Sequence, residues 1–327
     1  MDTFLAAQQI DIDQSSRAAA GLYERVVRSM SIDRLDDGLS EVWDGLHDVR
    51  DASDPADWRA FAAAMRTEDR LRELLHQDPF TRRAFEKPRG YAGDAVMMDY
   101  LYGVHSYHTA AAGASELGRE IFRFARTRPA ARAVCYRREH IAQLIDRTAA
   151  AVARPNILAI AAGHLREAER SSALADGLVG RLVALDADAE SLREVEARYG
   201  RLGVETIHAS VRHILAGKLR IGAFDFVYAA GLYDYLSDPV AGALTSRLFE
   251  IVNPGGELFI PNFVPSCRDR AFMEAFMNWD LIYRDEYDMS RLVESLPAAH
   301  VASYDIYRDP SDSIVYLRVK KARLATS

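Results

Sequence analysis

The residues best suited to binding a ligand follow a short apolar run. Asn156–Ala161 (NILAIA) leads into Ala162-Gly163-His164 and then into a helical pattern. A buried strand that turns on small residues into a helix N-terminus lets a nucleoside approach the backbone closely. Gly163 would allow that approach, and Ala161 is small enough to assist. The segment also fits an ordinary tight turn of an α/β protein, because the full Gly-x-Gly-x-Gly spacing is absent.

A carboxylate ends the next apolar run. Leu182–Leu185 (LVAL) is followed by Asp186, about twenty residues after the first turn. A carboxylate at that strand end can accept hydrogen bonds from two ribose hydroxyls. Asp188 competes for this role but is better suited to cap the following helix, and both acids also fit a simple turn. Asp186, with the adjacent Ala187, is therefore the candidate for ribose binding.

The third strand end offers a place for a base. Ser210 and Val211 follow a short strand at Thr206–Ala209. An adenine ring would lie there against backbone and a small hydroxyl.

The fourth strand end offers room for a reacting centre. Phe224–Ala229 (FDFVYA) is followed by the small residues Ala230 and Gly231, and then by Tyr233 and Asp234. Ligands of open α/β sheets bind beyond the carboxyl ends of the strands. Tyr233 and Asp234 are therefore catalytic candidates.

Proton transfer and metal binding are two further possibilities. His164 would lie at the far end of such a ligand, and imidazole titrates in the range needed for proton removal near neutrality. A structural histidine at a helix start is the alternative. Asp94 and Asp234 are the acidic candidates, and each also fits a cap or a loop. His105 and His108 form an HxxH pattern without a third ligand, so we expect no metal.

Composition excludes several classes of protein. The 327 residues are 49% apolar and 27% charged, as in ordinary soluble domains. The net charge of −7 and a pI near 5.8 argue against a general nucleic-acid or anionic-membrane surface. Two cysteines cannot form a disulfide framework, and no apolar stretch approaches the ~20 residues of a membrane span. With acids near the N-terminus in place of a signal peptide, we expect a cytoplasmic protein.

The sequence pattern predicts two parts of the chain with different secondary structure. The first part has helical periodicity and almost no strand signal, with a Gly/Pro loop at Lys87–Asp94. The predicted helices are Arg17–Met30, Leu39–Val49, Trp58–His76, Ser115–Arg126 and Ala130–Ala153. We therefore expect a helical cap or lid domain over residues 1–150.

Strands and helices alternate after Pro155, which is typical of a parallel, doubly wound sheet. Further predicted strands are Glu257–Pro261, Val301–Tyr307 and Ser313–Val319, and predicted helices are Ala189–Tyr199 and Ala241–Val252. The last two strands flank an Asp-Pro-Ser-Asp turn and predict an antiparallel hairpin. Residues 151–327 are thus expected to form a Rossmann-like α/β domain with a seven-stranded, mostly parallel sheet.

These features resemble class I methyltransferases that use S-adenosyl-L-methionine (AdoMet). Asn253-Pro254-Gly255-Gly256-Glu257-Leu258 resembles the turn before their fifth strand. From about residue 80 onward, the chain is similar to the bacterial branch named after the synthase of 3-hydroxypalmitic acid methyl ester. The motifs that carry this likeness are KPRGYAGD (87–94), ARAVCYRR (131–138), AAGHLRE (161–167), AGLYDYL (230–236) and WDLIYRDE (279–286).

The resemblance implies AdoMet as the ligand and an AdoMet-binding role for residues 151–327. Gly163 would lie by its carboxypropyl end, Asp186 by the ribose, and Ser210 and Val211 by the adenine. The loop at 89–94 and the helix of Arg132 and Arg137 would close over the ligand. The predicted cofactor-binding residues are Arg89, Arg132, Arg137, Ala161, Gly163, Asp186, Ala187, Ser210, Val211, Ala230 and Gly231. The predicted catalytic residues are Tyr91, Asp94, His164, Tyr233 and Asp234.

Methyl transfer from a sulfonium mainly requires alignment and exclusion of water. Aromatic faces stabilise the sulfonium by cation–π attraction, and the candidates are Tyr91, Tyr136, Tyr233, Tyr235 and Tyr283. A carboxylate acceptor needs no general base but does need a cationic anchor. Candidate anchors are Arg89, Arg132, Arg137 and Arg284, each of which also fits a plain salt bridge.

Three functions follow from this reading. The first is methyl transfer to a small-molecule acceptor, such as a carboxylate that becomes a methyl ester, in secondary metabolism or signalling. The second is cyclisation of AdoMet to azetidine-2-carboxylate with release of methylthioadenosine, as in some relatives of this branch. Two departures from the family pattern, at Ala161-Ala162-Gly163-His164 and Cys135-Tyr136, leave that alternative open. The third is a non-catalytic AdoMet-binding module.

Other readings of the same fold are weaker. The missing Gly-x-Gly-x-x-Gly and the terminal hairpin disfavour a Rossmann dehydrogenase, and the acidic balance disfavours RNA methylation. We expect a small-molecule substrate, no nucleic acid, no membrane and no metal. A homodimer is one option for the assembly.

Overall fold

The computed structural model describes residues 21, 24, 27–28, 34–67 and 69–323. The predicted helix Arg17–Met30 lies largely outside these residues. The chain forms two compact units. The helical unit consists of Met1–Arg132 and Ser266–Asp280, and the sheet unit consists of Ala133–Pro265 and Leu281–Ser327.

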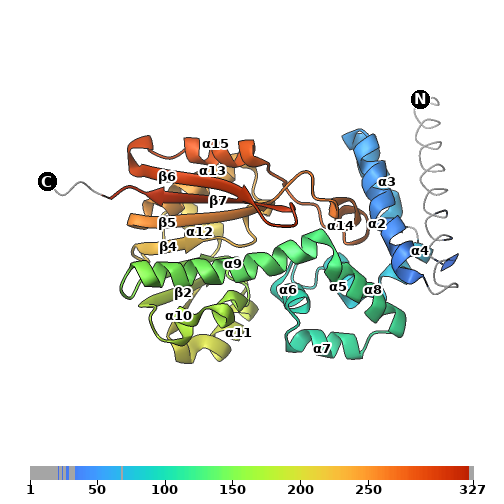
Figure 1. Ribbon diagram of the computed structural model, residues 1–327, viewed down its shortest axis with the longest axis horizontal. Coiled ribbons are helices and arrows are strands. Elements are labelled where there is room, and N and C mark those ends of the chain that lie inside the picture. Colours follow the sequence, from blue (N-terminus) through green and yellow to red (C-terminus); the bar gives the residue numbers. More distant parts are fainter. Residues whose placement is uncertain (1–20, 22–23, 25–26, 29–33, 68, 324–327) are drawn as a thin grey trace. The chain divides into compact units, whose positions relative to one another are not determined.

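The helical unit is built from helices, most of them short (Figure 1). They are α2 (Leu35–Ala52), α3 (Pro55–Thr67), α4 (Asp69–Leu75), α5 (Pro79–Glu86), α6 (Ala95–Tyr102), α7 (His105–Ala112), α8 (Glu116–Thr127) and α14 (Arg270–Phe276). The helix α9 (Pro129–Ala151) starts in this unit and continues into the sheet unit. The predictions for α2, α8 and α9 are confirmed, and the predicted helix Trp58–His76 is described as α3 and α4.

The helices α5 and α6 were not predicted, and side-chain caps explain both. Asp78 precedes Pro79 and accepts hydrogen bonds from the backbone N–H groups of Phe80 (2.8 Å) and Thr81 (3.0 Å). Asp94 caps α6 by accepting from the Met97 N–H at 2.8 Å. Each cap satisfies donors that a helix start leaves unpaired. Local capping therefore defines the start of each of these helices, which have only eight residues and so offer little room for a periodic pattern.

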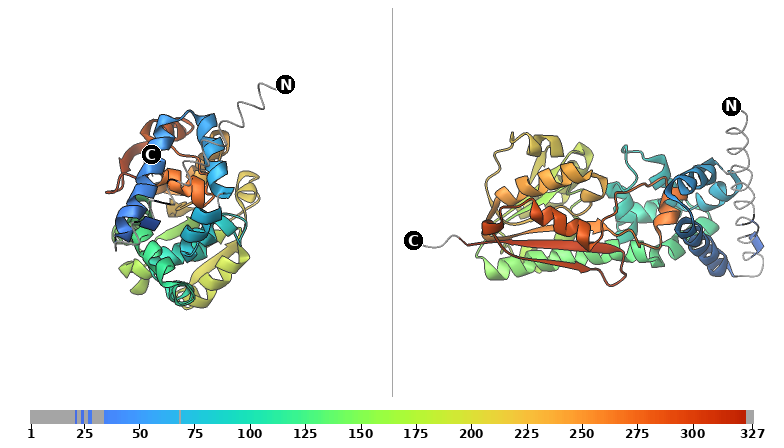
Figure 2. Two further views of the ribbon diagram at one scale, coloured as in Figure 1. Left: turned by 90° about the vertical axis from the view of Figure 1, so that its right-hand side faces the viewer. Right: turned by 90° about the horizontal axis from the view of Figure 1, so that it is seen from above.

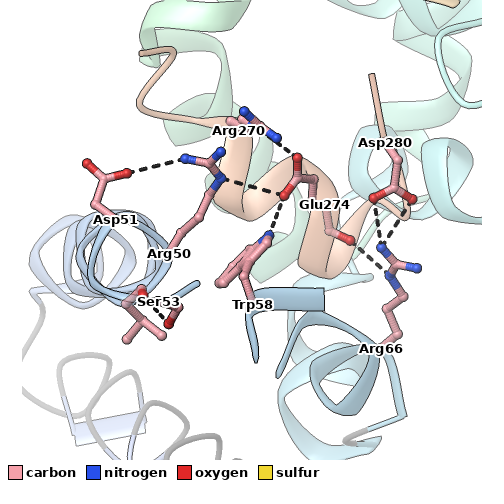
Figure 3. A network of polar contacts seen from close by, with 9 residues as sticks. Arg50, Asp51, Ser53, Trp58, Arg66, Arg270, Glu274 and Asp280 are labelled. Carbon is pink, nitrogen blue, oxygen red and sulfur yellow. Dashed lines mark hydrogen bonds and ion pairs between the residues drawn. The ribbon is translucent and has the colours of Figure 1, made fainter. Parts of the chain in front are cut away.

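The segment Ser266–Asp280 packs with helices that precede it by more than two hundred residues. It belongs to the range 151–327 that we expected to form the catalytic domain. Trp43 of α2 stacks on Phe272 of α14 with ring centroids 3.5 Å apart. Figure 3 shows Glu274 of α14, which accepts from the Trp58 indole N–H and from Arg270 Nε (2.6 Å). These contacts hold the segment in the helical unit.

The sheet unit contains one seven-stranded sheet in the order β3-β2-β1-β4-β5-β7-β6 (Figure 1). The strands are β1 (Asn156–Ile160), β2 (Arg181–Asp186), β3 (Val204–His208), β4 (Phe224–Tyr228), β5 (Val252–Phe263), β6 (Val301–Arg308) and β7 (Ile314–Lys321). The first five strands pair in parallel, and β7 pairs antiparallel with both β5 and β6. The predicted fold, with its helical region before the sheet, is confirmed.

Helices cover both faces of this sheet. They are α10 (Ser172–Ala175), α11 (Ala189–Tyr199), α12 (Val211–Leu215), α13 (Asp238–Glu250) and α15 (Glu286–Glu294), with short 3-10 turns η1 (Arg166–Arg170), η2 (Gly200–Leu202), η3 (Tyr233–Tyr235) and η4 (Ala298–His300). Figure 2 shows α9, in green, on one face and α13, in orange, on the other. Strands β1, β2 and β4 are almost entirely buried, as expected of parallel strands between two helical layers.

Two local features set the geometry of the later strands. The predicted turn at 253–256 lies within β5 as an irregularity, because Phe224 pairs with Val252 while Phe226 pairs with Glu257. Gly255 has φ +83°, a conformation that glycine adopts without a steric penalty. The hairpin between β6 and β7 turns on Asp309, whose carboxylate accepts from the N–H groups of Ser313 (2.8 Å) and Ile314 (2.7 Å).

Candidate ligand-binding site

The loop after β1 has an unusual backbone. Ala161, Gly163 and Leu165 have φ values of +51°, +53° and +52°. For residues with a side chain, this left-handed conformation costs of order 1 kcal/mol or more, and such strain concentrates at ligand sites. The predicted close approach of the backbone at Gly163 therefore coincides with a strained loop at the carboxyl edge of the sheet.

Asp186 ends β2 beside this loop. Its Oδ2 accepts from the Gly163 N–H and its Oδ1 from the Asp188 N–H, both at 2.8 Å. The carboxylate is 8% exposed. Each oxygen has a second lone pair, so this carboxylate keeps the capacity to accept from two ribose hydroxyls. Asp188 caps α11 by accepting from the Glu190 N–H at 2.9 Å, which is the capping role weighed for it from the sequence.

The end of β3 adjoins the same edge. The Ala209 N–H donates to the Asp186 carbonyl oxygen at 2.9 Å. Ser210 then precedes α12, which begins at Val211, and the Ser210 N–H donates to Nδ1 of His213 at 3.1 Å. Ala187 directly follows β2, and its carbonyl oxygen lies 3.0 Å from Nε2 of His208. The predicted adenine and ribose residues thus belong to adjoining strand ends.

Arg137 of α9 lies next to Gly231, beyond the end of β4. A Cβ placed on Gly231 would be 3.8 Å from Nη2 of Arg137. The Arg137 side chain is buried, with the residue 6% exposed. Among the residues that the structure describes, no carboxylate lies within 4.0 Å of its guanidinium and no hydrogen bond satisfies it. A buried cation is costly without a partner, so this guanidinium is suited to an anionic ligand.

Tyr233 and Asp234 are engaged inside the sheet unit. The buried Tyr233 hydroxyl lies 3.0 Å from Oγ1 of Thr245. Oδ1 of Asp234 accepts from the Phe263 N–H, and its carbonyl oxygen accepts from the Ile282 N–H, both at 2.7 Å. Burial raises the pKa of Asp234 to about 6, while the Phe263 hydrogen bond and the charges of Arg137 and Arg284 lower it. Asp234 thus ties together the two chain segments on either side of Ser266–Asp280.

Arg284, one of the candidate carboxylate anchors, is a structural residue. Its Nη1 donates to the carbonyl of Tyr233 (2.8 Å) and to Asn262 Oδ1 (2.9 Å). Its Nη2 donates to the carbonyl of Leu236 (2.6 Å) and to Asp238 (2.8 Å). These bonds use the guanidinium to hold the loop after β4, so we do not assign it to a ligand.

The predicted residues of the 87–94 loop belong to the helical unit. Arg89, Tyr91 and Asp94 lie between α5 and α6, and Arg132 is exposed on α9. The Asp94 carboxylate is fully buried, caps α6 and receives two hydrogen bonds from Arg83, at 2.9 and 2.7 Å. These contacts give Asp94 a structural role, and we leave it out of the proposed catalytic set.

His164 is buried in the strained loop, 6% exposed. Sequence reasoning missed two residues close to it, Glu167 and Tyr228. Both are buried, and the Tyr228 hydroxyl donates to Glu167 Oε1 at 2.7 Å. The signal was weak, because a glutamate in a helical pattern and a tyrosine in a strand are ordinary occurrences.

An aromatic group lies on the α9 face of the later strands. His140 Nε2 lies 2.7 Å from the Tyr307 hydroxyl, and the His140 and Tyr136 rings stack 5.6 Å apart. Tyr316 packs against both His140 and Tyr307. Among the described residues, none forms a hydrogen bond with the buried Tyr316 hydroxyl.

The strand order and the antiparallel β7 define a Rossmann-like fold of the class I methyltransferase type. No family model matches the chain, and no curated protein matches it. Among solved structures, one described as a possible exported protein from Bordetella parapertussis is 14% identical, with 83% of this chain and 100% of that chain covered and a TM-score of 0.53. At this identity the likeness concerns the fold alone.

Two methyltransferase structures are also similar in part. The N-methyltransferase NodS from Bradyrhizobium japonicum, in complex with S-adenosyl-L-homocysteine, is 17% identical, covering 56% of this chain and 86% of its own, with a TM-score of 0.41. The AdoMet-dependent methyltransferase SibL in its apo form is 16% identical, covering 77% and 76%, with a TM-score of 0.46.

In the described part of the chain, no helix has both the length and the apolar character needed to cross a membrane. Within the same residues, we find no cluster of three or more His, Cys, Asp or Glu side chains that would hold a metal ion.

Proposed function

We propose that the protein is an AdoMet-dependent methyltransferase that converts a small-molecule carboxylate into its methyl ester. The observation that carries this proposal is the buried Arg137 guanidinium, without a partner among the described residues, at the carboxyl edge where Asp186 ends β2. AdoMet carries a carboxylate at one end and a ribose diol near the other. The Arg137 guanidinium can bind the carboxylate, and the Asp186 carboxylate can accept hydrogen bonds from the ribose hydroxyls.

Each residue has a defined task in this proposal. Asp186 accepts hydrogen bonds from the ribose, Arg137 binds the methionine carboxylate, and Ser210 and Val211 border the adenine. The left-handed backbone at Ala161 and Gly163 brings the loop after β1 close to the ligand. When bound, AdoMet supplies a methyl group activated by its sulfonium sulfur.

A carboxylate acceptor agrees with the internal contacts of two of the predicted catalytic residues, Tyr233 and Asp94. The Tyr233 hydroxyl is buried against Thr245, and the Asp94 carboxylate is paired with Arg83. Both are committed to internal contacts and are poorly placed to take a proton from a substrate. A carboxylate is already an anion at neutral pH, so the chain needs no general base for it and has to anchor it with a cation, align it and exclude water.

Mass spectrometry of the products tests this function. The purified protein is incubated with AdoMet alone, and with AdoMet plus benzoate, hexanoate or 3-hydroxyhexanoate. We expect S-adenosylhomocysteine and a methyl ester only when an acid is present. Methylthioadenosine and azetidine-2-carboxylate formed together from AdoMet alone, and absent without the protein, would contradict methyl transfer and identify the cyclisation.

A pair of variants on α9 links the activity to the site. Arg137→Gln should lower the affinity for S-adenosylhomocysteine by about tenfold or more, because a charge-assisted hydrogen bond is lost. Arg138→Gln is the matched control, since Arg138 is paired with Glu139 at 2.8 Å. Equal affinities of the two variants would contradict the role of Arg137.

A further inference from the structure

Glu167 joins the ends of two strands. It belongs to η1, directly after the strained loop that follows β1, and Tyr228 is the last residue of β4. The 2.7 Å hydrogen bond from the Tyr228 hydroxyl to Glu167 Oε1 therefore spans β1 and β4. The strand order reverses direction between these two strands, and open α/β sheets bind ligands at that switch point.

The Glu167 carboxylate is buried, with the residue 8% exposed, and has unused hydrogen-bonding capacity. Among the described residues, Tyr228 is the only side chain that donates to it. Burial raises the pKa of Glu167, whereas the Tyr228 hydrogen bond and the charges of Arg137 and Arg138 lower it. Glu167 is bonded to Tyr228, which lies three positions before Gly231, the residue beside the Arg137 guanidinium.

Glu167 and Arg137 do not satisfy one another. Within the described part of the chain, no carboxylate comes within the 4.0 Å of an ion pair with Arg137. Arg137 and Glu167 are thus buried groups of opposite charge that do not form an ion pair with each other. A ligand that carries a positive and a negative charge close together would pair with both side chains at once. This pairing would offset the cost of burying Arg137 and Glu167.

We propose that Arg137 and Glu167 form a clamp for the α-amino-acid end of the ligand, with the carboxylate on Arg137 and the α-ammonium on Glu167. Tyr228 is a positioning residue that holds one oxygen of Glu167 so that the other faces the ammonium. The proposal rests on the proposed function, which assigns a ligand carboxylate to Arg137, and adds the residue that recognises the amine. The same chemistry would accept the amino-acid end of AdoMet or a free amino acid.

Calorimetry with two nucleosides tests the clamp. S-adenosylhomocysteine has the amino-acid end, and 5′-methylthioadenosine lacks it. Glu167→Gln should lower the affinity for S-adenosylhomocysteine by about tenfold or more and leave that for methylthioadenosine unchanged. Glu169→Gln is the matched control in the same turn, because Glu169 accepts from the Tyr199 hydroxyl (2.6 Å), and should change neither affinity.

Tyr228→Phe tests the positioning role with the ring retained. The variant should lower the affinity for S-adenosylhomocysteine a few-fold and leave the affinity for methylthioadenosine unchanged. This pattern also separates a binding effect from a folding defect, which would weaken both nucleosides.

L-methionine distinguishes the two sources of the amino-acid end. If L-methionine competes with S-adenosylhomocysteine in the wild type but not in Glu167→Gln, the clamp binds the amino-acid end of AdoMet itself. Binding of L-methionine on top of saturating S-adenosylhomocysteine, also lost in Glu167→Gln, assigns it to an amino-acid acceptor. Either result supports the clamp.

Two results would overturn the clamp while the proposed function stands. One is an affinity of Glu167→Gln that is unchanged for both S-adenosylhomocysteine and L-methionine, and the other is an equal loss for both nucleosides. If the wild-type protein binds neither nucleoside, the proposed function itself fails and the clamp fails with it.

Discussion

The carboxylate of Asp186 accepts a hydrogen bond from the backbone N–H of Gly163 at 2.8 Å. This bond joins the end of β2 to the strained loop after β1, so one side chain shapes the loop and keeps lone pairs for a ligand. The two residues were singled out separately from the sequence. Their direct contact makes the loop geometry depend on the same carboxylate that is proposed to bind ribose.

Replacing Asp186 should weaken ligand binding, whereas replacing Asp188 should affect stability alone. We expect Asp186→Ala to lower the affinity for S-adenosylhomocysteine by about tenfold or more, because two charge-assisted hydrogen bonds are lost. Asp188→Ala is the control: it removes the cap of α11 and should cost about 1 kcal/mol of unfolding free energy without changing affinity. Calorimetry and urea unfolding measure the two effects, and an unchanged affinity of Asp186→Ala would remove this residue from the site.

The buried Asp234 should make stability depend on pH. Its pKa is raised to about 6 in the folded protein, against an ordinary value of 3.8. The folded state therefore binds the proton more tightly, and this group's contribution to stability is lost as the pH rises from about 4 to about 6. The loss amounts to about 3 kcal/mol.

Asp234→Asn removes the ionisation and keeps an acceptor for the Phe263 N–H. The unfolding free energy of the variant relative to wild type should be larger at about pH 7.5 than at about pH 4.5. Urea unfolding at both pH values measures this difference. The prediction is wrong if the difference between the two proteins is the same at both pH values.

Removing the Tyr316 hydroxyl should stabilise the sheet unit. No described residue satisfies this buried hydroxyl, and phenylalanine keeps the packing against His140 and Tyr307. We expect Tyr316→Phe to raise the unfolding free energy by about 1 kcal/mol. Tyr233→Phe, whose hydroxyl lies 3.0 Å from Thr245, should lower it by a similar amount. Opposite signs in urea unfolding are the expected result, and a loss of stability in both variants contradicts it.

Glu274 should be essential to the helical unit. Its buried carboxylate accepts from Trp58 and Arg270 and lies 3.7 Å from Arg50 Nε (Figure 3). Glu274→Gln leaves both guanidinium groups facing a neutral amide and should cost about 2–4 kcal/mol.

Tryptophan fluorescence can follow the Glu274→Gln variant selectively. The three tryptophans, Trp43, Trp58 and Trp279, all belong to the helical unit. Their unfolding transition should shift to lower urea. The control Glu250→Gln, which removes an exposed pair with Arg247 in the sheet unit, should leave it unchanged. A fluorescence transition unaffected by Glu274→Gln would show that this network contributes little.

The sequence by itself determined the helical region before the sheet, the parallel strands and the terminal hairpin. These features depend on local periodicity and turn chemistry, which short segments encode directly. Small residues and acids at strand ends also indicated Gly163 and Asp186, because the carboxyl ends of parallel strands meet at one edge of a sheet. The capped helices α5 and α6 were not predicted, because each has only eight residues and depends on a cap residue.

Only the tertiary structure separated side chains of the same type. Arg137 and Arg284 looked equivalent as anchors, yet Arg284 donates to two backbone carbonyls and two side chains, while no described residue satisfies Arg137. Glu167 became a candidate only through its contact with Tyr228, sixty-one positions along the chain. The placement of Ser266–Asp280 in the helical unit likewise depends on Trp58 and Glu274, which are 216 positions apart. Whether a side chain is buried or paired depends on contacts between segments that are distant in sequence. Residue type and local spacing do not reveal these contacts.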